Sequence, residues 1–225
     1  MYKILYALIY WVFRPQTAMS KIEGLENLPK KEGFILAANH QNSHDPLIMI
    51  VALKKFFFRY VWAKKKKMYF IGSLDLKRQW LRYSFISLIF GLFEERVGYL
   101  TADKKGLKKA LAKLQKENIV VIFPEGRRNI TSILKPGKKG VAVLALLSGK
   151  KIIPVGCFGP AIFWLGQITG FFKKKWIKFG KPFCFPKADQ KKIDQEPEIL
   201  KQATAEVMGK ISLVCGKSRY ESTNL

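Results

Sequence analysis

Both histidines of the chain, His40 and His44, stand in the stretch GFILAANHQNSHDPLIMI, which runs from Gly33 to Ile50. Histidine has the unperturbed pKa nearest neutral pH, so two histidines placed together suggest proton transfer or metal binding. Asp45 follows them and precedes Pro46. A residue before proline avoids the helical region while proline suits the first helical position, so we expect Asp45 to cap a helix and turn toward His40. Its carboxylate would then hold one imidazole nitrogen and leave the other to act as a general base.

Two other interpretations of this stretch stay open. The His-Asp pair could be an ordinary hydrogen-bonded turn with no catalytic role. His40 and His44 are four residues apart and could share a metal ion if they lay on one helical face. Asn42 and Ser43 favour a turn instead, and the chain has no third histidine and no paired cysteines to complete such a site. We therefore expect no metal.

A second stretch, VVIFPEGRRN from Val120 to Asn129, places charged residues directly after an apolar run. The run predicts a buried strand, and the Pro-Glu-Gly sequence that follows predicts a sharp turn. Arg127 and Arg128 come next; the planar guanidinium matches phosphate oxygens, and Gly126 allows a close backbone approach. A solvated surface pair is the alternative for two adjacent arginines. Their position at a strand end, beside Glu125, favours phosphate binding.

Together the two stretches resemble the glycerolipid acyltransferases, the family typified by 1-acylglycerol-3-phosphate acyltransferase. The first block of that family, Asn-His followed after four residues by Asp, is matched by NHQNSHD, and its Phe-Pro-Glu-Gly-Thr-Arg block is matched by FPEGRRN. GLFEER from Gly91 to Arg96 is the candidate for the block between them. VWAKKK, LKPGKKGVA, IIPVG and KFGKPF resemble further landmarks in the family's order, so the resemblance runs from about Phe34 to Phe183.

The resemblance implies that His40 and Asp45 are the catalytic pair of an O-acyltransferase without a cofactor. The histidine would deprotonate the acceptor hydroxyl, which attacks an acyl thioester directly, with no acyl-enzyme. The acceptor would be 1-acylglycerol-3-phosphate, giving phosphatidate, or another lysophospholipid or lipid hydroxyl. His44 would be an accessory residue. The implied substrate-binding residues are Arg96, Glu125, Gly126, Arg127, Arg128 and Lys135.

Two departures from the family pattern concern the acceptor. Arg127 replaces the usual threonine and adds a charge beside the phosphate site. The second block is acidic at Glu94 and Glu95 and lacks its usual aliphatic residues.

The elements that must position these residues alternate along the chain. The predicted strands are Phe34–Asn39, Tyr60–Lys64, Asn118–Phe123, KIIPVGCFG from Lys151 and WIKFG from Trp176. The predicted helices are Pro46–Phe58, Thr101–Glu117, Gly140–Ser148 and Glu198–Leu213. This alternation predicts an α/β fold: a mixed, mostly parallel sheet flanked by helices, in one domain over residues 21–225.

The charge indicates a polyanionic partner, because 41 Lys+Arg face only 16 Asp+Glu and the net charge is +25. The partners that fit the resemblance are an anionic membrane surface, a lysophospholipid acceptor and an acyl-CoA or acyl carrier protein donor. Lysine clusters at Lys64–Lys67 and Lys173–Lys175 could attract anionic lipid. A non-enzymatic nucleic-acid binder is the alternative from another class, but no nucleic-acid module is recognisable and we expect no nucleic acid. A catalytically silent membrane-binding relative is a third possibility, which the intact His40 and Asp45 oppose.

The N-terminus, MYKILYALIYWVFRPQ, contains an apolar run of 10 residues from Ile4 to Phe13. As a helix it would extend about 15 Å, half the roughly 30 Å of a bilayer core, so it cannot span a membrane alone. We expect a helix over residues 1–20 that lies in the membrane interface, or alternatively one packed on the core. The apolar, aromatic segment Trp80–Phe93 could be a buried helix or a wall facing acyl chains. The predicted protein is thus membrane-associated, with its active site facing the cytoplasm, and the three unpaired cysteines fit a reducing compartment.

Overall fold

The computed structural model describes residues 21–41, 45–46, 49, 53, 67–72, 98–159 and 176–219. Several predicted features lie outside these residues: the N-terminal helix, the strand Tyr60–Lys64, the segment Trp80–Phe93 and most of the helix Pro46–Phe58. Within the described part of the chain, no helix is long and apolar enough to cross a membrane.

A seven-stranded sheet forms the centre of the fold, with the strand order β1-β8-β7-β2-β5-β3-β4. Its strands are β1 (Lys21–Glu23), β2 (Ile35–Ala38), β3 (Met68–Gly72), β4 (Tyr99–Thr101), β5 (Ile119–Ile122), β7 (Ile152–Phe158) and β8 (Trp176–Phe179). Neighbouring strands run parallel except β7 and β8, which are antiparallel. The predicted α/β fold with a mixed, mostly parallel sheet is confirmed.

Strand β2 lies at the centre of the sheet, where Ile35 is aligned with Val120 of β5 on one side and Ile152 of β7 on the other. All four β2 residues are buried, as expected of a parallel strand covered on both faces. Because parallel strands end at the same edge of a sheet, the segments that follow β2 and β5 leave the sheet side by side. These segments contain His40 and Glu125.

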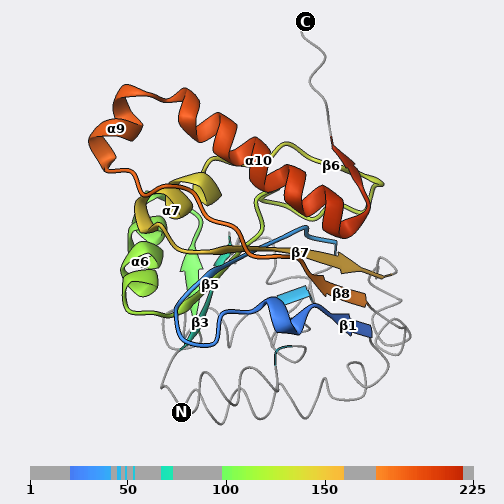
Figure 1. The fold of residues 1–225 in the computed structure, drawn as a ribbon. Coiled ribbons are helices and arrows are strands. Elements are labelled where there is room, and N and C mark those ends of the chain that lie inside the picture. Colours follow the sequence, from blue (N-terminus) through green and yellow to red (C-terminus); the bar gives the residue numbers. More distant parts are fainter. Residues whose placement is uncertain are drawn as a thin grey trace, which may run out of the picture.

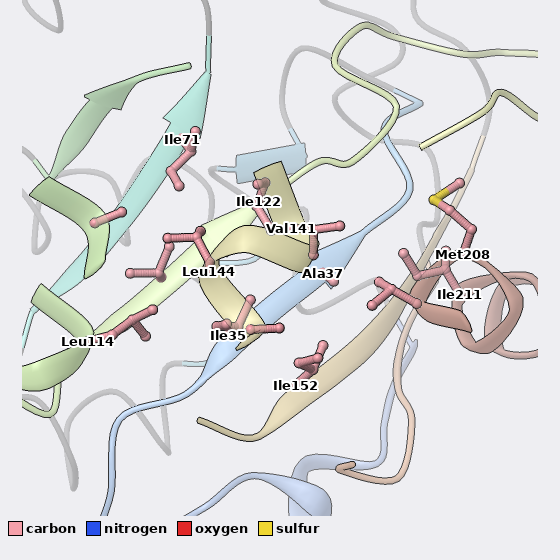
Figure 2. Packing of buried hydrophobic residues seen from close by; sticks show 14 of the residues in the cluster. Ile35, Ala37, Ile71, Leu114, Ile122, Val141, Leu144, Ile152, Met208 and Ile211 are labelled. Carbon is pink, nitrogen blue, oxygen red and sulfur yellow. The ribbon is translucent and has the colours of Figure 1, made fainter. Parts of the chain in front are cut away.

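The helices are the 3₁₀ turn η1 (Leu25–Asn27), α6 (Lys104–Gln115), α7 (Gly140–Ser148), α9 (Gln190–Gln195) and α10 (Glu198–Cys215). Helices α6, α7 and α10 lie on one face of the sheet (Figure 1). Figure 2 shows how Leu144 of α7 and Leu114 of α6 pack over the β2 residue Ile35, with Ile211 of α10 beside Ile152. A small second sheet pairs β6 (Ile133–Leu134) with β9 (Ser218–Arg219) in parallel.

The opposite face of the sheet carries the alternate residues of the same strands. Leu36 of β2, Val121 of β5 and Ile153 of β7 belong to a separate apolar cluster. Met49 and Leu53 are fully buried in that cluster, and the Leu53 amide donates to the Met49 carbonyl at 3.0 Å, as in a helical turn. The period of two along each strand therefore divides the core into two layers.

The strongest sequence patterns match the observed elements closely. Helix α7 has its predicted bounds, and the helix predicted to end at Leu213 continues to Cys215, where Gly216 with φ of 64° ends it. Helix α6 starts later than predicted because Asp103 caps it, its side chain accepting from the Gly106 amide at 2.6 Å. The sequence patterns do not predict β1, β3, β4, β6, β9, η1 or α9.

Candidate active site

His40 and Asp45 form a hydrogen-bonded pair just beyond the end of β2. The His40 Nδ1 lies 3.0 Å from Asp45 Oδ2. Because a carboxylate only accepts, Nδ1 carries the hydrogen and Nε2 is left as the nitrogen that can take up a proton. The Asp45 side chain is 5% exposed and the His40 side chain 18%, so the carboxylate is sheltered while the imidazole reaches the surface.

Asp45 does not occupy the N-cap position predicted from the sequence. Both Asp45 and Pro46 are helical, whereas Gln41 is not, so Asp45 lies inside the helix. Its Oδ2 also accepts from the Gln41 amide at 2.7 Å, which draws the carboxylate back toward the end of β2. The predicted pairing with His40 thus arises from within the helix, not from its cap.

Two neighbours fix the backbone and the ring of the histidine. Asn39 is almost fully buried. Its side-chain nitrogen donates to the backbone carbonyl of Cys157 at 3.0 Å, and its side-chain oxygen accepts from the backbone N–H of Cys157 at 2.7 Å. This exchange extends the pairing of β2 with β7 by one residue and explains why an asparagine precedes His40. The Phe123 ring stacks on the imidazole with 4.4 Å between ring centroids.

Glu125 joins the two predicted blocks through its side chain. It is 3% exposed, and its Oε1 accepts from the His40 amide at 3.2 Å. Its Oε2 accepts from the Asn129 side chain at 2.5 Å and from the Lys135 amide at 3.0 Å. The prediction that Glu125 binds substrate stays a prediction; in the structure its contacts anchor the loop that follows it.

A tight turn brings the arginines to the strand edge. The Gly126 amide donates to the Phe123 carbonyl at 2.9 Å, with Pro124 inside the turn, which is a position that proline favours. Gly126 has φ of 70°, a left-handed conformation that side chains disfavour. The end of the Lys138 side chain fills the space beside it: a Cβ at position 126 would lie 2.5 Å from the Lys138 Cε.

The predicted cations gather on this loop. Arg127, Arg128 and Lys135 are exposed, and the Lys135 ammonium donates to the Arg128 carbonyl at 3.3 Å. These cations follow Glu125, whose side chain is bonded to the His40 amide, so the loop starts beside His40. The predicted residues Arg96 and His44 lie outside the described residues, as do the clusters at 64–66 and 173–175.

Lys217, from the segment after α10, holds the same loop and was not anticipated. Its ammonium donates to the Thr131 carbonyl at 2.6 Å and to the Asn129 carbonyl at 3.4 Å. The Gln41 side-chain amide is assigned in the orientation in which both its oxygen and its nitrogen form hydrogen bonds. Its oxygen then accepts from the Lys217 ammonium at 2.8 Å, and its nitrogen donates to the Cys157 carbonyl at 3.0 Å. Lys217 thus connects the histidine segment to the arginine loop. No local pattern in the sequence signals this, because its loop partners are 86 and 88 residues away.

Among the described residues, no group of three or more histidine, cysteine, aspartate or glutamate side chains is arranged to hold a metal ion. What the site can do is proton transfer at an imidazole oriented by a carboxylate, next to a cationic loop that can hold an anionic group.

A family model described as Acyltransferase matches residues 20–158, more than half of the 225 residues. The chain belongs to the Acyltransferase family. A crystal structure of the 1-acyl-sn-glycerophosphate (LPA) acyltransferase PlsC from Thermotoga maritima has a similar fold, with a TM-score of 0.58 over 92% of this chain and 80% of that chain. The two sequences are 20% identical, so this likeness concerns the fold.

Relatives with similar sequences carry a consistent name. A 1-acyl-sn-glycerol-3-phosphate acyltransferase of Borreliella burgdorferi is 27% identical over 154 residues, which is 65% of this chain and 54% of that protein. A 1-acyl-sn-glycerol-3-phosphate acyltransferase alpha of Mus musculus is 27% identical over 162 residues, covering 72% of this chain and 50% of that protein. The chain spans about half the length of the curated relatives it matches.

Proposed function

We propose that the protein transfers a fatty acyl group from an acyl thioester to the free hydroxyl of 1-acylglycerol-3-phosphate, giving phosphatidate. The observation that carries the proposal is the His40–Asp45 pair, tied through the buried Glu125 to a loop with two exposed arginines. The family match and the names of the relatives support the same reaction.

In the proposed mechanism His40 is the general base. Its Nε2 takes the proton of the acceptor hydroxyl as the oxygen attacks the thioester carbonyl carbon. The Asp45 carboxylate holds the Nδ1 hydrogen, fixes the tautomer and stabilises the imidazolium. The carbon–sulfur bond then breaks, the thiolate leaves with the proton from Nε2, and the ester and free thiol are the products. No acyl-enzyme forms.

The cations supply acceptor recognition in this proposal. The guanidinium groups of Arg127 and Arg128 bind the acceptor phosphate as bidentate donors, and Lys135 extends the positive field. Gly126 lets the phosphate approach the backbone. Arg96 would complete the set. The extra arginine at 127 makes another phosphorylated lysolipid the second candidate acceptor, and a panel of acceptors decides between them.

The setting of the reaction is part of the proposal. Residues 21–225 would be one catalytic domain, and residues 1–20 a helix in the membrane interface, with the site facing the cytoplasm. The net charge of +25 favours association with anionic lipid and with an anionic donor, either acyl-CoA or acyl carrier protein.

Acyl transfer from labelled acyl-CoA to lysophosphatidate in mixed micelles tests the proposal. We expect His40→Ala and Asp45→Asn to lose about 10²- to 10⁴-fold in kcat, because the first removes the base and the second disturbs its tautomer. Asp194→Asn, at an exposed position of α9, is the matched control and should keep full activity. Equal rates for wild type and His40→Ala would refute the mechanism. Inactivity of the wild type with every lysolipid and both donors would refute the function.

A further inference from the structure

Two isoleucines are exposed on the segment that follows the turn at Gly126: Ile130 in the loop and Ile133 at the start of β6. Ile130 is 56% exposed and Ile133 is 48% exposed. In the part of the chain that the structure describes, Leu213 is the one other large hydrophobic side chain with comparable exposure. Single exposed apolar residues are ordinary, but two within four residues, on the segment bonded to the His40 backbone, indicate a contact surface.

The loop is held in a fixed shape that keeps these side chains outward. The Asn129 side chain donates to the Ile133 carbonyl at 2.7 Å, and its oxygen accepts from the Thr131 hydroxyl at 2.7 Å. The Lys217 ammonium binds the carbonyls of Asn129 and Thr131 from the other side. The isoleucines are therefore presented by an ordered scaffold.

Exposed cations flank the two isoleucines in the sequence. Arg127, Arg128 and Lys135 are exposed on the same loop. The sequence contains no Asp or Glu from Gly126 to Ala188, so this stretch is strongly basic. Apolar side chains flanked by exposed cations match the boundary between acyl chains and anionic headgroups of a membrane.

We propose that the loop Arg127–Lys135 docks on an anionic lipid bilayer, with Ile130 and Ile133 entering the acyl boundary and the three cations facing the headgroups. The Asn129 amide donates to the His40 carbonyl at 2.6 Å, so the docked loop is bonded directly to the backbone of the reactive residue. Docking brings His40 to the surface where a lipid acceptor resides. Docking of this loop does not require acyl transfer.

Site-specific fluorescence tests the docking in the full chain. In a Cys184→Ser background, an environment-sensitive nitrobenzoxadiazole group is attached at Ile130→Cys, at Ile133→Cys or at the control Gln195→Cys. The control lies on α9, and α9 and β6 are at opposite ends of the 18-residue α10, which is about 27 Å long (Figure 1). Cys157 and Cys215 are buried and stay unlabelled.

With phosphatidylglycerol vesicles we expect emission to rise severalfold at positions 130 and 133, with quenching by spin-labelled lipids, and no change at 195. Unchanged emission at 130 and 133 would overturn the proposal, whether or not the protein sediments with the vesicles. A rise on adding acidic acyl carrier protein but not vesicles would also overturn it and identify a protein-binding surface instead.

A second variant measures the contribution of the isoleucines to binding. Ile130→Ser/Ile133→Ser should lower the partition coefficient onto anionic vesicles about tenfold, because both side chains lose their apolar transfer free energy. Gln195→Ser/Gln202→Ser, at exposed positions on α9 and in the first half of α10, is the control and should leave partitioning unchanged. Activity toward a short-chain, water-soluble acceptor should be kept by both variants, which separates lost docking from lost catalysis. Equal partitioning of the double variant and wild type would overturn the proposal.

Discussion

The Glu125 carboxylate accepts a hydrogen bond from the backbone amide of His40 at 3.2 Å. Glu125 belongs to the stretch FPEGRRN, and through this bond it also positions the backbone of the stretch NHQNSHD. Its second oxygen binds the Asn129 side chain and the Lys135 amide, so one buried carboxylate organises both sides of the site. Together with the Asn129 amide, which donates to the His40 carbonyl, this carboxylate positions the loop relative to His40.

Glu125→Gln is expected to cost about 1–3 kcal/mol of folding free energy, because one carboxylate oxygen becomes an NH₂ group that faces a donor. The glutamine side chain has one acceptor oxygen instead of two. It therefore cannot accept all three hydrogen bonds that the carboxylate accepts from His40, Asn129 and Lys135. Urea unfolding and kcat on the same samples measure the effect, and kcat should fall more than acceptor affinity. Glu26→Gln, at an exposed position, is the control and should change neither. A fully stable, fully active Glu125→Gln enzyme would contradict the anchoring role.

Lys217→Met should loosen the arginine loop, because a side chain of similar length loses all three N–H donors. We expect a loss of about 1–2 kcal/mol in unfolding free energy and a lower kcat/KM for the acceptor. Lys217→Arg keeps donors at this position and should restore part of the activity. Lys191→Met, on the surface of α9, controls for the loss of one charge. Equal kcat/KM in Lys217→Met and Lys191→Met would show that the hydrogen bonds of Lys217 to the loop have no role in the reaction.

The part of the fold that could be predicted has strong local patterns. The runs ILAA and IVVI are short, apolar and bounded by polar residues, and they are strands β2 and β5. Strand β3 was missed because its apolar residues follow a lysine run without a turn signal. Strands β1 and β4 have three residues each, too few to show a period. Helix α9 has six residues with Ile193 as its one buried residue, so it has no apolar face to detect.

The site was predictable where neighbours in sequence are neighbours in space. The Asp45-Pro46 dipeptide placed a carboxylate near His40, although it acts from within the helix. The role of Glu125 was not predictable, because one of its partners, the His40 amide, lies 85 residues away in the sequence. Lys217 could not be found at all, since its contacts depend on where the end of α10 meets the loop.

Thiol reactivity should differ sharply among the three cysteines. Cys184 is exposed, whereas Cys157 and Cys215 are buried. Burial raises the pKa of the Cys215 thiol, partly opposed by the backbone and charge of Lys217, so little thiolate forms there at neutral pH. We expect maleimide to modify one cysteine per native chain by mass spectrometry and three in urea, with Cys184→Ser unmodified until it unfolds. Modification of Cys215 as fast as Cys184 would show that the end of α10 is not packed as described.

Gly126 and Gly216 offer a matched pair for the turn beside the arginines. Both have left-handed backbones, with φ of 70° and 64°, so an alanine at either should cost about 1 kcal/mol. A Cβ at Gly216 meets nothing within 4 Å, whereas one at Gly126 displaces the end of the Lys138 side chain. Because that flexible end can swing away, the two variants should have similar melting temperatures.

The variants should differ in acceptor binding. Gly126→Ala should move the Lys138 ammonium from the turn and add bulk where the proposed acceptor phosphate would approach the backbone, so KM for a phosphorylated acceptor should rise. Gly216→Ala should leave KM unchanged, and Lys138→Met should reproduce part of the Gly126→Ala effect. If Gly126→Ala instead lost much more stability than Gly216→Ala with an unaltered KM, the close contact of Lys138 with the turn would serve packing and not acceptor binding.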